Sequence, residues 1–201
     1  MKKMSTSRIA MFVGLGFLLI VFMNGCGSYN SMVTKDENLS GQWKQIEVAY
    51  QARMDKTKNL LAIVKKSGDY EQGTLQQVME ARSKATSIQL SVDDLTPENL
   101  KKFQAAQSQL GASLGRLMAI SENYPNLKAM DGFRDLQSQY EGIENRISTQ
   151  RLRFNEAVKD YNTYIRKFPR NLWAKTFGFE RKEIYFDANE GAEDAPDIES
   201  M

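Results

Sequence analysis

The sequence predicts an all-α protein, a long antiparallel four-helix bundle that follows an N-terminal membrane-anchoring segment. Three observations support this fold class. Long stretches carry apolar residues at gaps of three and four, which places those residues on one face of a helix. The stretches are joined by turns of about two to six residues, as in antiparallel bundles. An apolar run of about fifteen residues, from Ile9 to Met23, follows a basic N-terminus.

The composition excludes several classes of function. The chain has 201 residues, no histidine and a single cysteine. Histidine-based catalysis, histidine-ligated metals and intrachain disulfides are therefore excluded. With 27 basic and 25 acidic residues, the net charge of +2 gives no electrostatic reason to expect nucleic acid as a partner. The sequence also has no phosphate-binding loop or nucleophile elbow. We expect a protein that is not an enzyme and that uses no cofactor or metal.

Residues 1–26 are predicted to be a signal or membrane-anchor segment. Three basic residues precede the apolar run, which favours a cytoplasmic N-terminus and an extracytoplasmic body, on the periplasmic or cell-surface side. The run is shorter than the roughly 20 residues that span a bilayer, and it fits a secretory signal. The pair Gly25-Cys26 resembles a bacterial lipoprotein cleavage site, at which Cys26 would be lipidated. An uncleaved signal anchor is the alternative, and both tether the body to a membrane.

The body is predicted to span residues 36–186, after a polar spacer over 27–35. The first helix is expected over about 36–66, because its apolar residues keep helical spacing until Gly68. A second helix is expected over about 70–91.

The remaining helices have clearer boundaries. The Thr96-Pro97-Glu98 sequence is a strong helix start, so a third helix is expected from there to about residue 123. A fourth is expected over about 127–168, followed by a C-terminal segment that folds back. Residues 187–201 carry six acidic residues and no basic one, and we expect a disordered tail.

Two stripes run along the fourth helix. The apolar stripe, with the spacing of a coiled-coil seam, consists of Ile147, Phe154, Val158, Tyr161, Ile165 and Phe168. Beside it lies a polar stripe, Glu144, Arg151, Asn155 and Asn162, which Arg53 and Arg82 of other helices are expected to join. Two interpretations are open. The polar side chains form a hydrogen-bond network that fixes helix register, or they line a groove for a peptide or an anionic small molecule.

The segment from Glu144 to Pro169 resembles the signature of the LemA family, with the pattern E-x₂-I-x₃-R-x₂-[FY]-N-x₂-V-x₂-Y-N-x₂-I-x₂-F-P. Weaker similarity extends from about Tyr29 to Phe186. The resemblance implies a membrane-anchored bacterial helical protein and no particular enzymatic activity. It also implies partners at the cell envelope, such as a membrane-associated peptidase, and relatives that serve membrane organisation.

The C-terminal segment is rich in aromatic residues. They are Trp173, Phe177, Phe179, Tyr185 and Phe186. Either they close the end of the bundle or they form a contact patch for a partner. The predicted function is therefore a non-catalytic interaction or scaffold role at the cell envelope. The alternative is a ligand-binding bundle that uses the Arg- and Asn-lined groove, and a third hypothesis, an enzyme using carboxylates alone, lacks a predicted cleft.

Overall fold

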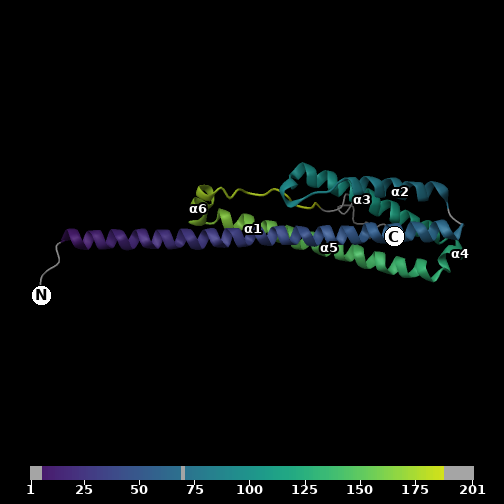
Figure 1. The fold of residues 1–201 in the computed structure, drawn as a ribbon, viewed down its shortest axis with the longest axis horizontal. Coiled ribbons are helices and arrows are strands. Elements are labelled where there is room, and N and C mark those ends of the chain that lie inside the picture. Colours follow the sequence, from purple (N-terminus) through teal and green to yellow (C-terminus); the bar gives the residue numbers. More distant parts are fainter. Residues whose placement is uncertain (1–5, 69–70, 188–201) are drawn as a thin grey trace, which may run out of the picture. The chain divides into compact units, whose positions relative to one another are not determined.

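The computed structural model describes residues 6–68 and 71–187 (Figure 1). Within these ranges the chain is helical and contains no β-strand. The elements in order are α1 (Thr6–Ser67), α2 (Gln72–Ser87), the 3-10 helix η1 (Val92–Asp94), α3 (Pro97–Ser121), α4 (Pro125–Lys128), α5 (Asp131–Arg166) and α6 (Arg170–Phe177). The all-α prediction is confirmed for these residues. The predicted acidic tail lies outside them, apart from Asp187.

The chain divides into two compact units, and α1 and α5 contribute to both. Of the described residues, the first unit comprises 6–40 and 157–182, and the second unit comprises 41–68, 71–156 and 183–187. The long helices of the second unit share one apolar core. It consists of Met54, Leu60, Leu61, Val64, Leu75, Val78, Ala81, Ala85, Leu110, Leu114, Leu117, Leu127, Phe133 and Leu136. Removal of these side chains from water is the main favourable term in folding.

Helix α1 begins much earlier than predicted. The expected start near residue 36 is wrong, and the expected spacer over 27–35 is helical. No proline occurs before Pro97, so nothing in the sequence forces a break. Met32 and Leu39, one heptad apart, are fully buried, which shows that the apolar face continues through the predicted spacer.

Helix α2 is shorter than predicted. It ends at Ser87, and the extended backbone of Ile88 terminates it. The indole Nε1 of Trp43 donates a hydrogen bond to the backbone oxygen of Leu90 at 3.1 Å. This tertiary bond gives the Leu90 carbonyl a protein partner in the non-helical course of the segment, and so favours that course.

The start of α3 was predicted correctly. The hydroxyl of Thr96 accepts a hydrogen bond from the backbone N–H of Asn99 at 3.1 Å, and Pro97 occupies the first helical position. Both features are local, so the sequence specifies them without knowledge of the rest of the fold.

The predicted fourth helix is two helices, α4 and α5. Leu127 and Phe133 are both buried in the core of the second unit. Six positions in a straight helix turn the side chain by about 240°, because each residue adds about 100°. A straight helix would therefore point these two side chains in different directions, and the break between α4 and α5 allows both to be buried.

Phe168 was predicted to belong to the apolar stripe and is instead 80% exposed. The other stripe residues, from Ile147 to Ile165, are buried. Helix α5 ends at Arg166, so Phe168 no longer follows the helical spacing of the stripe. In the C-terminal segment, residues 170–177 form helix α6, after which the described chain is irregular.

Candidate functional site

Arg53 is the centre of the polar network in the second unit. Its Nε donates to Oε1 of Glu144 at 2.7 Å, and its Nη2 pairs with Oε2 of the same carboxylate. Its Nη1 donates to the backbone oxygen of Gln107 at 3.0 Å. Arg53 is buried, and this two-pronged pairing with a carboxylate is the strongest geometry available to a guanidinium group. One side chain of α1 therefore bonds both α3 and α5.

Two tyrosines adjoin this ion pair. Burial raises the pKa of Tyr140, and the Glu144 carboxylate, with which it shares a hydrogen bond, adds to the increase. Burial also raises the pKa of Tyr50, whose ring lies 5.3 Å from the guanidinium carbon of Arg53. A raised tyrosine pKa keeps the phenol neutral at physiological pH, so neither tyrosine supplies a base there.

Asn155 and Arg151 hold the end of the C-terminal segment in the second unit. The Asn155 amide donates to the backbone oxygen of Phe186 and accepts from its N–H, both at 2.9 Å. Nη2 of Arg151 donates to the backbone oxygen of Asp187 at 2.9 Å, and its guanidinium lies over the Phe186 ring, 4.9 Å from the centroid. The predicted groove residues thus bind a segment of the chain itself.

Asn162 does the same in the first unit. Its amide donates to the backbone oxygen of Lys182 at 2.7 Å and accepts from the Lys182 N–H at 2.9 Å. The hydroxyl of the adjacent Tyr161 donates to the backbone oxygen of Glu180 at 3.1 Å. Burial, with contributions from the Asp36 and Glu180 carboxylates, raises the pKa of Tyr161 to about 12. Asn155 and Asn162, one heptad apart and each preceded by an aromatic residue, therefore share one structural task, in which the Asn pairs with both backbone groups of a single residue.

Replacing Asn155 with Ala is expected to release Phe186. The change leaves an N–H and a carbonyl of the C-terminal segment without their protein partner, at a cost of about 1–3 kcal/mol. Hydrogen exchange of the Phe186 amide should accelerate, and the free energy of unfolding should fall. Asn145→Ala, an exposed position on the same helix, is the control and should change neither. Unchanged protection of the Phe186 amide in Asn155→Ala would contradict this role.

Arg82 bonds a different group from those that Arg53 and Glu144 bond. Its Nε donates to the backbone oxygen of Met54 at 3.5 Å, so it links α2 to α1 within the second unit. Arg82 was predicted to join the polar stripe, and the described contacts instead place it against the backbone of α1.

The members of the predicted aromatic patch are divided between the two units. Phe186 is buried in the second unit, where its ring stacks on that of Trp43 with centroids 6.2 Å apart, and Tyr185 is partly exposed. Phe177 and Phe179 belong to the first unit, and both contact the ring of Tyr29 edge-on, at 5.1 and 5.8 Å. Phe186 is therefore a core residue.

Gly178 explains how Phe177 and Phe179 reach the same ring. Its φ of +77° is in the left-handed region and terminates α6, with the N–H of Phe179 bonded to the backbone oxygen of Ala174 at 2.9 Å. The reversal of chain direction at this glycine brings both phenylalanines onto Tyr29.

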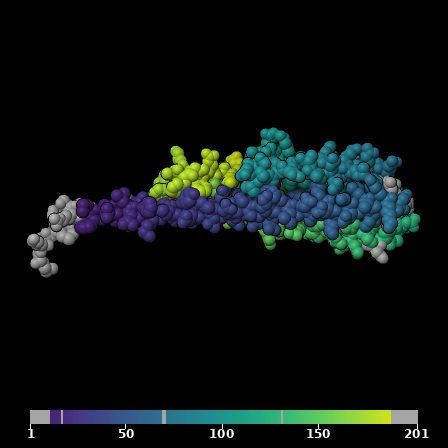
Figure 2. Space-filling view, in the orientation of Figure 1, coloured from purple at the N-terminus to yellow at the C-terminus, as the bar shows by residue number. Residues whose placement is uncertain are grey.

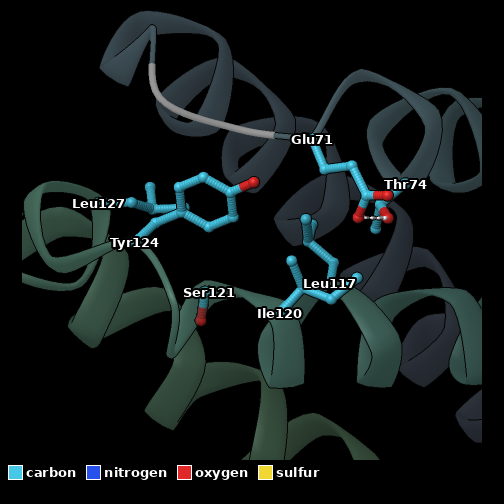
Figure 3. A pocket seen from close by; sticks show the side chains of 7 residues that line it. All are labelled: Glu71, Thr74, Leu117, Ile120, Ser121, Tyr124 and Leu127. Atoms are coloured by element: carbon cyan, nitrogen blue, oxygen red, sulfur yellow. Dashed lines mark hydrogen bonds between the residues drawn. The ribbon is translucent and has the colours of Figure 1, made fainter.

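The remaining candidates offer little space or chemistry. A pocket between α2, α3 and α4 is shown in Figure 3, where the hydroxyl of Thr74 donates to Glu71 at 2.9 Å. Its volume of about 10 Å³ accommodates no more than about one water molecule. No cluster of three or more potential metal ligands occurs in the part of the chain that the structure describes. Cys26, the predicted lipidation site, is exposed on α1.

Sequence analysis found the polar stripe but missed several of its partners. Gln107 and Tyr140 complete the surroundings of Arg53, and Gln104 donates to the backbone oxygen of Asp187 at 3.2 Å. Gln107 lies four residues after Phe103 and three before Leu110, and this helical spacing was the available signal for it.

Helix α1 carries the feature that defines the class of protein. Among the described residues, it is the one helix whose length and apolar composition suit a membrane crossing, with an 18-residue window of mean hydropathy 1.8 near the N-terminus. A signal sequence satisfies the same criterion. The fold and this segment define an all-α protein with an N-terminal apolar helix. The LemA family profile matches residues 42–199, and the chain belongs to the LemA family.

Several relatives are magnetosome proteins. Magnetosome proteins MamQ 2 and MamQ 1 of Paramagnetospirillum magneticum are each 27% identical over 174 residues, which cover 78% of this chain and 64% of the relative. Magnetosome protein MamQ of Magnetospirillum gryphiswaldense is 26% identical over 180 residues, covering 81% of this chain and 66% of the relative. The chain thus spans just under two thirds of the length of these curated relatives.

Proposed function

We propose that this protein is a membrane-anchored member of the LemA family with a non-catalytic interaction or scaffold role at the bacterial cell envelope. The observation that carries the proposal is the surface of α1 near its N-terminus. Nine large apolar side chains there are 54–69% exposed, and Figure 2 shows this part of the helix in purple. They are Met11, Phe12, Val13, Leu15, Leu18, Leu19, Ile20, Phe22 and Met23. Each gains roughly 1.5–3 kcal/mol on transfer from water to an apolar environment. A bilayer supplies that environment.

The polar stripe supports a structural role for its own residues. Arg53, Glu144, Asn155 and Asn162 are bonded to other groups of the protein. We infer that these bonds fix helix register and the C-terminal segment, and that partners are recognised by the outer surface. In this proposal α1, α2, α3 and α5 of the second unit form a LemA-like antiparallel four-helix bundle.

The orientation and the partner follow from charge and from the relatives. The basic residues before the apolar run favour a cytoplasmic N-terminus, so we infer an extracytoplasmic body. The relatives are magnetosome proteins, which supports a role in an assembly. An envelope protein, such as a membrane-associated peptidase, is the class of partner that we propose.

The anchor is tested by charge placed in the apolar run. The double change Leu15→Arg and Leu19→Arg is expected to move the protein from the carbonate-resistant membrane fraction to the soluble fraction. Each charge at the centre of a spanning helix costs about 2.5–3.5 kcal/mol on insertion scales. Val48→Arg, at an exposed position of the same helix outside the run, should leave the protein in the membrane. A double variant that sediments with membranes like the wild type would contradict the proposed anchor.

The fate of Cys26 decides how the anchor is made. A lipoprotein begins at Cys26, has lost residues 1–25, and carries a blocked thiol. An uncleaved signal anchor retains the mass of the full chain, and its exposed Cys26 reacts with a membrane-impermeant maleimide added to cells. Intact-mass spectrometry of the membrane fraction, before and after the maleimide, distinguishes the two.

A further inference from the structure

Helix α6 and the residues around it present both apolar and basic side chains to the surface of the first unit. The apolar members, Phe168 and Leu172, are 80% and 58% exposed. The basic members, Arg166, Lys167 and Lys175, are exposed as well. We call these five residues the α6 surface. Packing in the core of the first unit does not account for these side chains, because they are exposed.

The α6 surface is fixed next to the apolar run of α1. The ring of Trp173 lies against Gly25, where an added Cβ would approach three ring carbons to 3.3–3.4 Å. Trp173 also stacks on Phe177 at 5.9 Å, and Phe177 contacts Tyr29 edge-on. Glycine at position 25 permits this close contact between α6 and α1. The contact lies two residues beyond Met23, the last residue of the apolar run.

The charge of this region is strongly positive. Residues 166–182 contain six basic residues and one acidic residue. Arg166, Lys175 and Arg181 contribute to the lining of an open pocket of about 430 Å³ at the end of α5 and beside α6. Asn171 adds an amide to the same lining. The lining also includes one acidic residue, Glu180, which the three basic residues outnumber. Guanidinium, ammonium and amide groups around one hollow suit the oxygen atoms of a phosphate group.

We propose that the α6 surface binds the headgroup region of an anionic lipid bilayer. This proposal rests on the membrane anchoring proposed above. A helix that leaves the hydrocarbon core near Met23 reaches the headgroups within a residue or two, because each residue advances about 1.5 Å. Tryptophan is enriched at that depth, and an amphipathic helix with basic residues lies in that plane. Phe168 and Leu172 enter the acyl boundary, and the basic side chains bind lipid phosphates.

The test uses the full chain in proteoliposomes. A polarity-sensitive fluorescent amino acid replaces Leu172 in one protein and Phe168 in another, and Lys101, an exposed position in the second unit, serves as the control. Vesicles of phosphatidylcholine, with or without phosphatidylglycerol, contain brominated acyl chains as quenchers. Flotation of the vesicles first establishes that each protein is anchored. Failure to float would therefore overturn the proposed anchor, and the proposal for α6 with it.

For protein that floats, the fluorescence decides the matter. We expect the emission at positions 168 and 172 to shift to the blue and to be quenched by brominated lipid, more strongly with phosphatidylglycerol, while position 101 remains water-like. Water-like emission at positions 168 and 172, the same as at position 101, would overturn the α6 proposal while leaving the anchor intact. A blue shift without quenching would show that protein, such as a second copy of the chain, covers the surface, and would also overturn it.

Charge variants test the role of the basic residues. Lys167→Gln and Lys175→Gln are each expected to weaken binding of the α6 surface to phosphatidylglycerol vesicles roughly fivefold. This is the contribution of one basic residue near an anionic membrane. Lys58→Gln and Lys101→Gln, at exposed positions of the second unit, are the matched controls and should have no effect. Equal quenching in the Lys175→Gln and Lys101→Gln proteins would contradict binding of lipid phosphates.

Discussion

Replacing Trp43 with Ala is expected to lower the free energy of unfolding by about 3–5 kcal/mol, the range for truncating a large aromatic core residue. Trp43 is fully buried. Its ring contacts those of Phe103, Phe154 and Phe186 at centroid distances of 5.7, 5.5 and 6.2 Å, and its Nε1 bonds Leu90. The change therefore removes contacts to α3, α5, the C-terminal segment and the segment before η1. Thermal or denaturant unfolding of the purified protein measures the loss.

This expected loss in the free energy of unfolding is large for a folded protein. Native proteins are stable by only about 5–15 kcal/mol, so the variant is expected to lose about a fifth or more of that stability. Val48→Ala, at an exposed position of the same helix, is the control and should change the free energy of unfolding by no more than about 0.5 kcal/mol. A Trp43→Ala protein as stable as Val48→Ala would show that the aromatic cluster around Trp43 does not stabilise the fold.

Replacing Glu144 with Ala is expected to cost about 3 kcal/mol, at the lower end of the range for breaking a buried ion pair. The side chain of Arg53 is 6% exposed and that of Glu144 is 34% exposed, so the pair is unevenly buried. Removing the carboxylate leaves a buried guanidinium whose described acceptors are the backbone oxygen of Gln107 at 3.0 Å and its side-chain oxygen at 3.5 Å, both neutral. The cost arises mainly from this uncompensated charge.

Two comparisons separate that cost from the general effect of a mutation on α5. Glu141→Ala, at an exposed position one turn earlier, should be close to neutral. The double change Arg53→Met and Glu144→Leu should be less destabilising than the sum of its single changes, because apolar replacement of both partners leaves no buried charge. Additive effects in the double variant would contradict the ion pair as the link between α1 and α5.

The two interpretations of the polar stripe make opposite predictions for these variants. A network that fixes helix register predicts the losses given above. A groove evolved for a ligand predicts unchanged or raised stability, since residues at binding sites are often not optimised for folding. The described hydrogen bonds of Arg53, Asn155 and Asn162 favour the first interpretation.

The parts of the fold that sequence analysis predicted are those that local chemistry specifies. The cap at Thr96 needs only its neighbours Pro97 and Asn99. The buried seam of α1 from Leu39 to Val64 follows from helical spacing alone. The helical course of residues 27–35 and the break before α5 are linked to tertiary packing, because Met32 and Phe133 are fully buried in the folded chain. The spacing of apolar residues along the sequence does not indicate such packing.

Sequence analysis predicted which residues belong to the candidate site but not which groups they bond. Spacing put Glu144, Arg151 and Asn155 on one line of the helix, and Arg53 was expected to join them. The sequence could not show that Arg53 and Glu144, 91 residues apart, would pair. Nor could it show that Asn155 would bind Phe186, because an extended segment offers many backbone groups and only the folded chain selects one. The same limit placed Phe186 in a surface patch.

The central claim, a non-catalytic interaction role at the cell envelope, is tested most directly by site-specific photo-crosslinking in intact cells. Probes replace Leu152 and Val48, exposed apolar residues of the second unit, and Lys101 serves as the exposed control. Mass spectrometry identifies the adducts. We predict that one envelope protein is captured reproducibly from Leu152 or Val48 and not from Lys101. The same scattered adducts at all three positions would contradict an interaction role for this body.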